Sequence, residues 1–154
     1  MKDIEHLARR TVDCAFAIHR DLGPGLLESV YEALIAQSLE RCGLVVERQK
    51  PVSFVYNGLR LDDGFRADLL VAGQLLVELK SVERLAPVHT KQVLTYLRLM
   101  NLPLGLLVNF GAATLKEGVQ RVLNTRADMS RIEVWTNNPL GPDEASAMKS
   151  GTSS

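Results

Sequence analysis

Residues 68–80 are Asp68-Leu69-Leu70-Val71-Ala72-Gly73-Gln74-Leu75-Leu76-Val77-Glu78-Leu79-Lys80. Two apolar runs flank the short group Ala72-Gly73-Gln74, which predicts two strands, over 65–71 and 75–81, joined by a tight turn. Side chains alternate faces along a strand, so Glu78 and Lys80 share one face. Folding about the turn would bring Asp68 close to Glu78. We therefore expect a hairpin that carries charged groups within an otherwise apolar sheet.

The part of the chain before this hairpin changes from helical to strand periodicity. Apolar residues recur at three- and four-residue intervals over 3–21 and 26–42, which predicts two helices. Gly23-Pro24-Gly25 ends the first helix and Gly43 the second, because glycine permits a left-handed cap and proline cannot continue a helix. Short strands are predicted at 45–47, 52–56 and 59–61, with turns at Asn57-Gly58 and at Asp62-Asp63-Gly64.

The part after the hairpin alternates again between the two periodicities. Its spacing predicts, in order, a helix over 88–100, a buried strand over 104–110, a short helix over 115–123 and a strand over 132–135. From residue 137 the chain is rich in small and polar residues, which predicts a disordered tail over 137–154. The 154 residues fit one domain, and we assign it to 1–136.

Composition limits the class of protein. The chain is 46% hydrophobic and 23% charged, and its 18 basic and 18 acidic residues leave no net charge, which argues against a strongly basic nucleic-acid-binding arm. The first six residues include Lys2, Asp3 and Glu5 and lack the apolar region of a signal peptide. No apolar run approaches the roughly 20 residues that a membrane span needs. We expect a cytoplasmic protein without a membrane partner, with Cys14 and Cys42 as reduced, packed thiols.

The charges of the hairpin suggest a chemistry. Asp68 and Glu78 would repel each other in apolar surroundings unless a cation sits between them. Mg²⁺ prefers carboxylate and carbonyl oxygens and would resolve this repulsion. Lys80 could then orient a water or stabilise charge on a phosphate oxygen. An ordinary ion pair on a half-exposed strand explains the same alternation, so the pattern alone leaves both interpretations open.

Two motifs carry a family resemblance. Gly25-Leu26-Leu27-Glu28-Ser29-Val30-Tyr31 matches the signature GxxExxY, and Asp68 followed by Glu78-Leu79-Lys80 resembles the D…ExK core of the PD-(D/E)XK nuclease superfamily. The chain looks like a GxxExxY protein, a small branch of that superfamily, over about residues 7–123. One departure is Ala67, which stands where the superfamily name has proline, although many members lack that proline.

The resemblance implies an α/β fold with a restriction-endonuclease-like core, a mixed central sheet flanked by helices. It implies metal ligands at Asp68 and Glu78, with the Leu79 carbonyl as a third, and the ion would be Mg²⁺ or Mn²⁺. Lys80 would be the catalytic lysine and Glu28 a carboxylate that enters the site from a helix. From its place between Leu27 and Val30, we expect Glu28 to lie near the packed face of that helix. Gln92 and Tyr96 resemble the Q-x-x-x-Y element of the family and would line the same cleft.

Further cations follow the hairpin. Arg84 and Lys91 are candidates for a basic rim that binds substrate near the site, although a solvated face is the simpler interpretation for each of them.

Three functions remain at this point. The first is a Mg²⁺-dependent phosphodiesterase acting on DNA or RNA, which the complete carboxylate–lysine set favours. The second is a non-catalytic nucleic-acid-binding or self-assembling protein that retains the nuclease fold, which the neutral net charge favours. The third is a structural α/β protein, which requires the D…ELK pattern to be accidental. A 17.0 kDa chain has little surface for gripping a duplex, so we expect a homo-oligomer.

Overall fold

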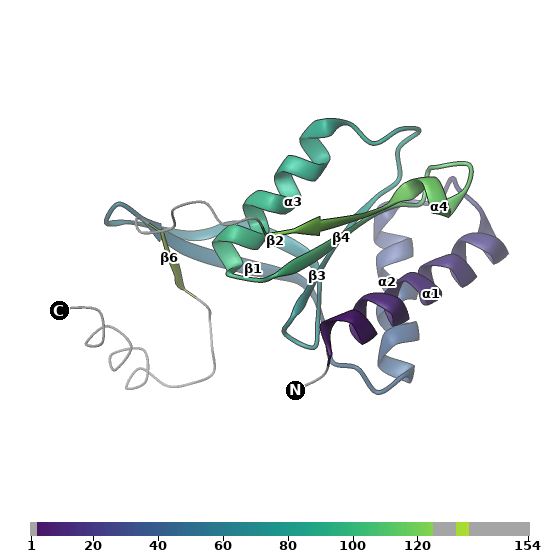
Figure 1. Ribbon diagram of the computed structural model, residues 1–154, viewed down its shortest axis with the longest axis horizontal. Helices are drawn as coiled ribbons and strands as arrows, with labels where there is room; N and C mark the ends of the chain where they lie inside the picture. The colour runs from purple at the N-terminus through teal and green to yellow at the C-terminus, as the bar shows by residue number, and fades with distance from the viewer. Residues whose placement is uncertain (1–2, 125–131, 136–154) are drawn as a thin grey trace.

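The computed structural model describes residues 3–124 and 132–135 (Figure 1). Its strands are β1 (Val46–Tyr56), β2 (Leu59–Val71), β3 (Leu75–Lys80), β4 (Leu104–Asn109), β5 (Val119–Leu123) and β6 (Ile132–Trp135). Its helices are α1 (Ile4–Leu22), α2 (Glu28–Arg41), α3 (Pro87–Met100) and the single turn α4 (Leu115–Gly118). The described strands form one sheet in the order β5-β4-β3-β2-β1-β6.

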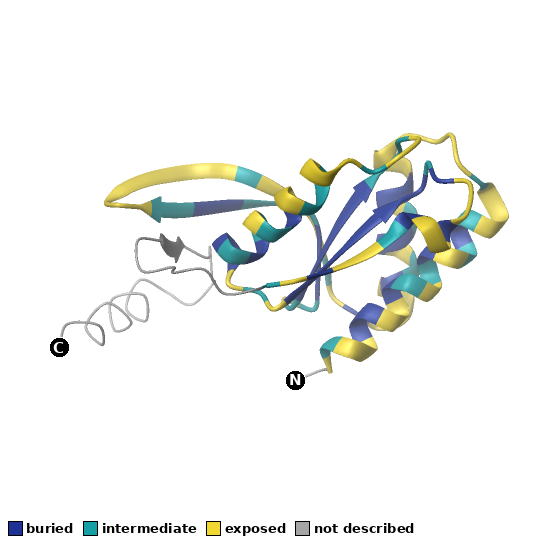
Figure 2. Cartoon of the chain, turned by 45° about the horizontal axis from the view of Figure 1, so that its top comes forward, coloured by how far each residue is buried: buried dark blue, intermediate teal, exposed yellow. Residues whose placement is uncertain are grey.

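The sheet is mixed and covered on both faces. Strands β3 and β4 are parallel and the other neighbours are antiparallel. Helices α1 and α2 pack on one face, over Val77 and Leu79 among others, and α3 packs on the opposite face, over Leu70 and Leu76 (Figure 1). The predicted central mixed sheet flanked by helices is confirmed. Burial is greatest along β3 and β4, whereas the far end of the β1–β2 hairpin is exposed (Figure 2).

Helix α3 connects the two parallel strands. A parallel pair cannot be closed by a tight turn, so the chain leaves the end of β3, crosses over the sheet as α3 and returns as β4. The start of α3 therefore lies at the end of the sheet where β3 finishes with Lys80. This topology places the helix that carries Gln92 and Tyr96 beside the charged end of β3.

Both predicted hairpin turns that flank β2 are present. Asn57 and Gly58 have φ of 48° and 82°, and Ala72 and Gly73 have φ of 51° and 66°. Two consecutive residues with positive φ are the geometry of the tight turn that matches the twist of antiparallel strands. The turn at Ala72-Gly73 is the one that brings the two carboxylates of the hairpin together.

The predicted turn at Asp62-Asp63-Gly64 is wrong. These residues lie within β2, and β1 is likewise continuous from Val46 to Tyr56. Instead of ending the strand, these turn-forming residues lie opposite an irregularity in the pairing of β1 with β2, where the register shifts between Val52 and Phe54. Asp63 has φ of 51°, its amide donates to the Ser53 hydroxyl, and a Cβ at Gly64 would collide with the Phe54 ring.

The predicted helix over 115–123 is also wrong beyond its first turn. Helix α4 ends at Gly118, and Val119–Leu123 form the edge strand β5, which pairs with β4. A Cβ at Gly118 would collide with the Asn109 carbonyl, so the chain passes close to β4 at this point and continues along it. Pairing with an exposed strand edge outweighs the weak helical periodicity of so short a segment.

Three further expectations concern the C-terminal tail, membrane spans and the two cysteines. The predicted disordered tail from 137 lies outside the described residues. No helix of the described chain is long and apolar enough to cross a membrane. Cys14 and Cys42 are both free thiols, but the expectation that both are packed is wrong for Cys42, which is exposed where α2 ends.

Candidate active site

The sheet opens between β2 and β3 at the level of Asp68 and Glu78. The antiparallel register runs as far as the pair Leu69–Val77. At the next pair, Asp68 and Glu78, main-chain amides donate to side-chain carboxyl groups instead of to main-chain carbonyls. The Asp68 amide donates to Oε1 of Glu78 at 3.3 Å, and the Leu79 amide donates to Oδ2 of Asp68 at 2.9 Å. These crossed bonds hold two carboxyl groups against each other where the ladder ends.

The Glu78 carboxyl lies in an environment that disfavours its charge. The residue is 3% exposed. Burial raises the pKa of Glu78 to about 9, the nearby Asp68 carboxyl acts in the same direction, and Lys80 offsets only part of the shift. Glu78 therefore keeps its proton at neutral pH unless a cation takes that place.

Lys80 lies on the same face of β3 as Glu78. The intervening Leu79, like Val77, packs under α1 and α2, so the alternate side chains are directed towards the face covered by α3. The positive charge of Lys80 partly offsets the rise that burial causes in the pKa of Glu78, so the ammonium lies close enough to act on that carboxyl.

A buried amide holds the loop that follows Lys80. Asn109 is 1% exposed, and its Oδ1 accepts from the amides of Val82 and Gly111, both at 3.0 Å. Its Nδ2 donates to the Val82 carbonyl at 2.8 Å. A Cβ at Gly111 would collide with that same Val82 carbonyl. The end of β3 is therefore clamped to the end of β4.

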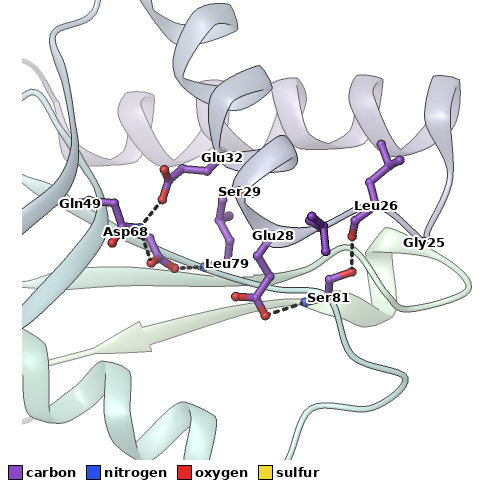
Figure 3. Close-up of a pocket in the computed structure, with 10 residues that line it drawn as sticks. Gly25, Leu26, Glu28, Ser29, Glu32, Gln49, Asp68, Leu79 and Ser81 are labelled. Carbon is purple, nitrogen blue, oxygen red and sulfur yellow. Dashed lines mark hydrogen bonds between the residues drawn. The ribbon is translucent and has the colours of Figure 1, made fainter.

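The second oxygen of Asp68 is bound by a residue from β1. Gln49 Nε2 donates to Oδ1 of Asp68 at 3.1 Å and to Oε1 of Glu32 at 2.6 Å (Figure 3). Glu32, on α2, is 5% exposed, and Arg48 forms an ion pair with it at 3.2 Å. Asp68 thus has a donor on each oxygen, one from β1 and one from β3.

Glu28 reaches the same region from the start of α2. Its Oε1 accepts from the Ser81 amide at 3.3 Å, and the Ser81 hydroxyl donates to the Leu26 carbonyl at 2.9 Å. Glu28 and Asp68 line one cavity of about 690 Å³ (Figure 3). Its other lining residues are Gly25, Leu26, Leu27, Ser29, Glu32, Gln49, Leu79 and Ser81, whereas Glu78 and Lys80 lie outside this lining.

The expectation that Glu28 lies near the packed face of its helix is wrong. Its neighbours Leu27 and Val30 are 72% and 40% exposed, and Glu28 itself is exposed. The buried face of α2 begins with Tyr31 and continues through Ile35 and Leu39. The first turn of α2 therefore projects beyond the core, which leaves Glu28 open to the cavity.

Tyr31 fixes the loop that precedes Glu28. The Tyr31 hydroxyl donates to the Gly23 carbonyl at 2.6 Å and accepts from the Leu26 amide at 3.2 Å. Its fully buried ring stacks on Phe110 with centroids 4.1 Å apart. Gly25, between the two bonded residues, has φ of 111°, which a residue with a Cβ rarely adopts. The glycine and the tyrosine of the GxxExxY pattern thus have structural roles: the glycine allows the loop conformation, and the tyrosine hydroxyl holds the loop by hydrogen bonds.

Helix α3, on the face of the sheet opposite α1 and α2, carries Tyr96. Burial raises the pKa of Tyr96, and the charges of Glu78 and Asp68 add to that effect, so the phenol lies within their field. Its ring stacks on Phe65 with centroids 3.9 Å apart. Gln92 is exposed one helical turn before Tyr96, towards the end of β3.

The two candidate rim cations are solvent-exposed. Lys91 lies in the first turns of α3, and Arg84 lies in the connection between β3 and α3. Both positions are at the end of the sheet where β3 finishes. Neither residue lines the cavity of Glu28 and Asp68.

Sequence reasoning missed Glu32, Gln49 and Asn109. Glu32 carried a signal, because it follows Glu28 by four residues and so lies on the same side of α2. Gln49 carried none, since its contact with Asp68 depends on a φ of 49° within β1, which no pattern of residue types indicates. Asn109 ends the buried run of β4, and a polar residue at the end of an apolar strand is a weak signal of a structural amide.

The donor set can be compared with what a divalent cation requires. Among the residues that the structure describes, no three His, Cys, Asp or Glu side chains gather closely enough to share a metal. Asp68 and Glu78 supply two carboxylates. The amide of Leu79 points to Asp68, and because the N–H and C=O of one strand residue point to the same side, the Leu79 carbonyl also faces β2. Two carboxylates and one carbonyl fit Mg²⁺, which keeps several waters and takes few protein ligands.

Comparison with known proteins agrees with this architecture. No curated protein and no solved structure matches the chain. A family model described as the PD-(D/E)XK nuclease superfamily matches residues 5–122, a span that includes Glu28, Asp68, Glu78 and Lys80. The narrower assignment to the GxxExxY branch stays a prediction. A mixed sheet flanked by helices is a restriction-endonuclease-like core, and with this match over most of its length the chain belongs to the PD-(D/E)XK nuclease superfamily.

Proposed function

We propose that this protein is a divalent-metal-dependent nuclease that hydrolyses phosphodiester bonds in DNA or RNA. The observation that carries the proposal is the contact between Asp68 and Glu78 at the point where β2 and β3 part, with Lys80 two residues further on. Superfamily membership supports nuclease-like chemistry in general. The metal requirement is inferred from the chemistry of the pair, and the nucleic-acid substrate is inferred from superfamily membership.

The proposed ligands are the carboxylates of Asp68 and Glu78 and the carbonyl of Leu79. A bound Mg²⁺ or Mn²⁺ would supply an activated water and neutralise charge on the phosphate. Glu78 must give up its proton to act as a ligand, and the burial that raises its pKa makes this carboxyl costly to ionise without a nearby cation. The pair is therefore better suited to hold a cation than to form a simple ion pair with Lys80.

Lys80 and Glu28 complete the proposed catalytic set. Lys80 is charged and adjacent to the pair, so it would stabilise negative charge that develops on a phosphate oxygen. Glu28 opens into the cavity beside Asp68 and would orient water there. Gln92 would donate a hydrogen bond to the substrate from α3.

Substrate contacts are proposed for Tyr96, Lys91 and Arg84. Glu78 and Asp68 add to the rise that burial causes in the pKa of Tyr96, which indicates that the phenol is near the pair, and the two cations are exposed at the end of the sheet where β3 finishes. The small domain would grip nucleic acid as a homo-oligomer, and we propose that it acts in the cytoplasm. In this proposal, the two cations bind the phosphates of the nucleic acid near the cleaved bond.

The competing function is a non-catalytic protein that keeps this fold and binds nucleic acid or self-assembles. Two observations favour it: the zero net charge of the chain, and the absence of a third acidic ligand beside Asp68 and Glu78 in the described residues. Under this function, nucleic acid would bind without cleavage, and its affinity would not depend on Mg²⁺.

A cleavage assay separates the two functions. The protein is incubated with single- and double-stranded DNA and RNA, with Mg²⁺, with Mn²⁺ or with EDTA. We expect cleavage with a metal and none with EDTA, and loss of both cleavage and metal binding in Asp68→Asn. Lys116→Ala is the matched surface control, since Lys116 lines a separate groove with Glu5 and Arg121. Nucleic-acid binding without cleavage under every condition would favour the competing function.

A further inference from the structure

A continuous chain of hydrogen bonds leads from α2 to the Asp68 carboxylate. Arg48 contacts Oε2 of Glu32 through Nε and Nη2, both at 3.2 Å. The other Glu32 oxygen accepts from Gln49 at 2.6 Å, and Gln49 in turn donates to Asp68 at 3.1 Å (Figure 3). Because Glu32 is 5% exposed, this buried charge depends on these partners.

The orientation of the Gln49 amide follows from its neighbours. Ionised carboxylates only accept hydrogen bonds, and Gln49 has one on each side, from Glu32 and from Asp68. Its NH₂ group has two hydrogens, one for each carboxylate. A side chain of the same length without a donor would leave both carboxylates short of a partner.

The main chain of β1 is shaped to direct Gln49 to this position. Gln49 has φ of 49°, a conformation that residues with a Cβ rarely adopt within a strand. The neighbouring pairs Arg48–Leu69 and Lys50–Ala67 keep the same register, so the unusual conformation changes the direction of one residue only. Strained main chain that survives in an otherwise regular strand often marks a functional position.

We propose that Gln49, anchored by Glu32, is a positioning residue for the Asp68 carboxylate. Gln49 holds Oδ1 of Asp68 while the Leu79 amide holds Oδ2, so the carboxylate is fixed in the plane between β1 and β3 before any ligand arrives. This inference rests on the proposed function, because fixing the carboxylate matters if Asp68 binds a cation. A carboxylate that is already fixed loses less conformational freedom when the cation binds. The hydrogen-bonding partners of metal ligands are typically worth about 10- to 100-fold in metal affinity.

The test uses three variants and two measurements. Gln49→Met removes the donor and keeps the side-chain length. The double variant Glu32→Gln with Gln49→Glu exchanges amide and acid, which restores a hydrogen bond between positions 32 and 49 but turns a carboxylate towards Asp68. Gln37→Met is the control, because Gln37 is an exposed glutamine on the same helix as Glu32.

The first measurement is made without metal. Hydrogen exchange of the Leu79 amide, followed by NMR, reports whether Asp68 still accepts its bond. We expect faster exchange and a shifted Leu79 resonance in Gln49→Met and no change in Gln37→Met. Unchanged Leu79 exchange in Gln49→Met would overturn the inference, whatever the protein does with metals.

The second measurement is a calorimetric titration with Mn²⁺ beside a thermal melt. We expect Gln49→Met to raise the Kd for Mn²⁺ by about 10-fold or more. The exchanged double variant should recover most of the melting temperature and none of the Mn²⁺ affinity. If it recovered both, Gln49 would only tie β1 to α2, and the inference would be wrong. A wild type without Mn²⁺ binding, together with faster Leu79 exchange in Gln49→Met, would contradict the proposed function and support the positioning role.

Discussion

The Asp68 amide and the Glu78 carboxyl are joined by a hydrogen bond of 3.3 Å across the point where β2 and β3 part. Burial at this point raises the pKa of Glu78 from an ordinary value of 4.5 to about 9. Between these two pH values the folded state holds a proton that the unfolded state has released. The contribution of Glu78 to the stability of the metal-free protein is therefore most favourable below pH 4.5. It becomes less favourable as pH rises towards 9.

Replacing Glu78 with glutamine should stabilise the metal-free protein. Glutamine resembles the protonated acid and does not titrate, so the loss of stability with rising pH disappears. The gain should be small near pH 5 and grow by at most about 1.4 kcal/mol per pH unit up to about pH 9. Chemical denaturation in EDTA at pH 5, 7 and 9 measures it. A Glu78→Gln variant that is less stable than wild type at pH 8 would mean that the carboxyl is ionised in the fold.

Metal affinity should rise with pH. If Glu78 is a ligand, each Mn²⁺ that binds must displace its proton, because burial keeps the pKa of the free carboxyl high. The association constant should increase about tenfold per pH unit between pH 6 and 8 and level off near 9. Titration calorimetry in two buffers of different ionisation enthalpy should show about one proton released per ion at pH 7. An affinity that is independent of pH would remove Glu78 from the ligand set.

The sequence predicts the meeting of Asp68 and Glu78 well, and for a physical reason. Strand alternation has a fixed period, and the tight turn at Ala72-Gly73 allows only one antiparallel register, so two residues placed symmetrically about it must approach. The same logic failed at Asp62-Asp63-Gly64. Turn-forming residues also serve bulges, and the difference depends on the partner strand rather than on the residues themselves.

The surroundings of Asp68 could not be predicted in the same way. Gln49 reaches the carboxylate only because its own main chain departs from strand geometry, and Glu32 is buried only because α2 crosses over that point. Both facts come from tertiary packing. Local patterns therefore predicted the acidic pair, while the residues that orient it became visible only in three dimensions.

Tyr31→Phe should loosen the loop that carries Gly25 and leave the core intact. The ring remains stacked on Phe110, but the hydroxyl bonds to the Gly23 carbonyl and the Leu26 amide are lost. We expect a loss of about 1–3 kcal/mol in the free energy of unfolding. We also expect faster hydrogen exchange at the Leu26 amide, measured by NMR. Unchanged exchange there would show that the loop is held by other contacts.

Lys80→Ala tests the proposed chemistry most directly. Lys80 acts on Glu78 through its charge and is not a proposed ligand, so the Kd for Mn²⁺ should change much less than turnover. Loss of one electrostatic stabiliser should lower the cleavage rate by about 10²-fold or more. Single-turnover cleavage with saturating Mn²⁺ measures this rate directly, and Lys116→Ala, a lysine in a separate groove, should cleave as wild type does. If only nucleic-acid binding occurs, Lys80→Ala should instead weaken affinity modestly and reduce its dependence on salt, because one phosphate contact is lost. Cleavage that persists at the wild-type rate in Lys80→Ala would mean that the reaction takes place elsewhere on the protein.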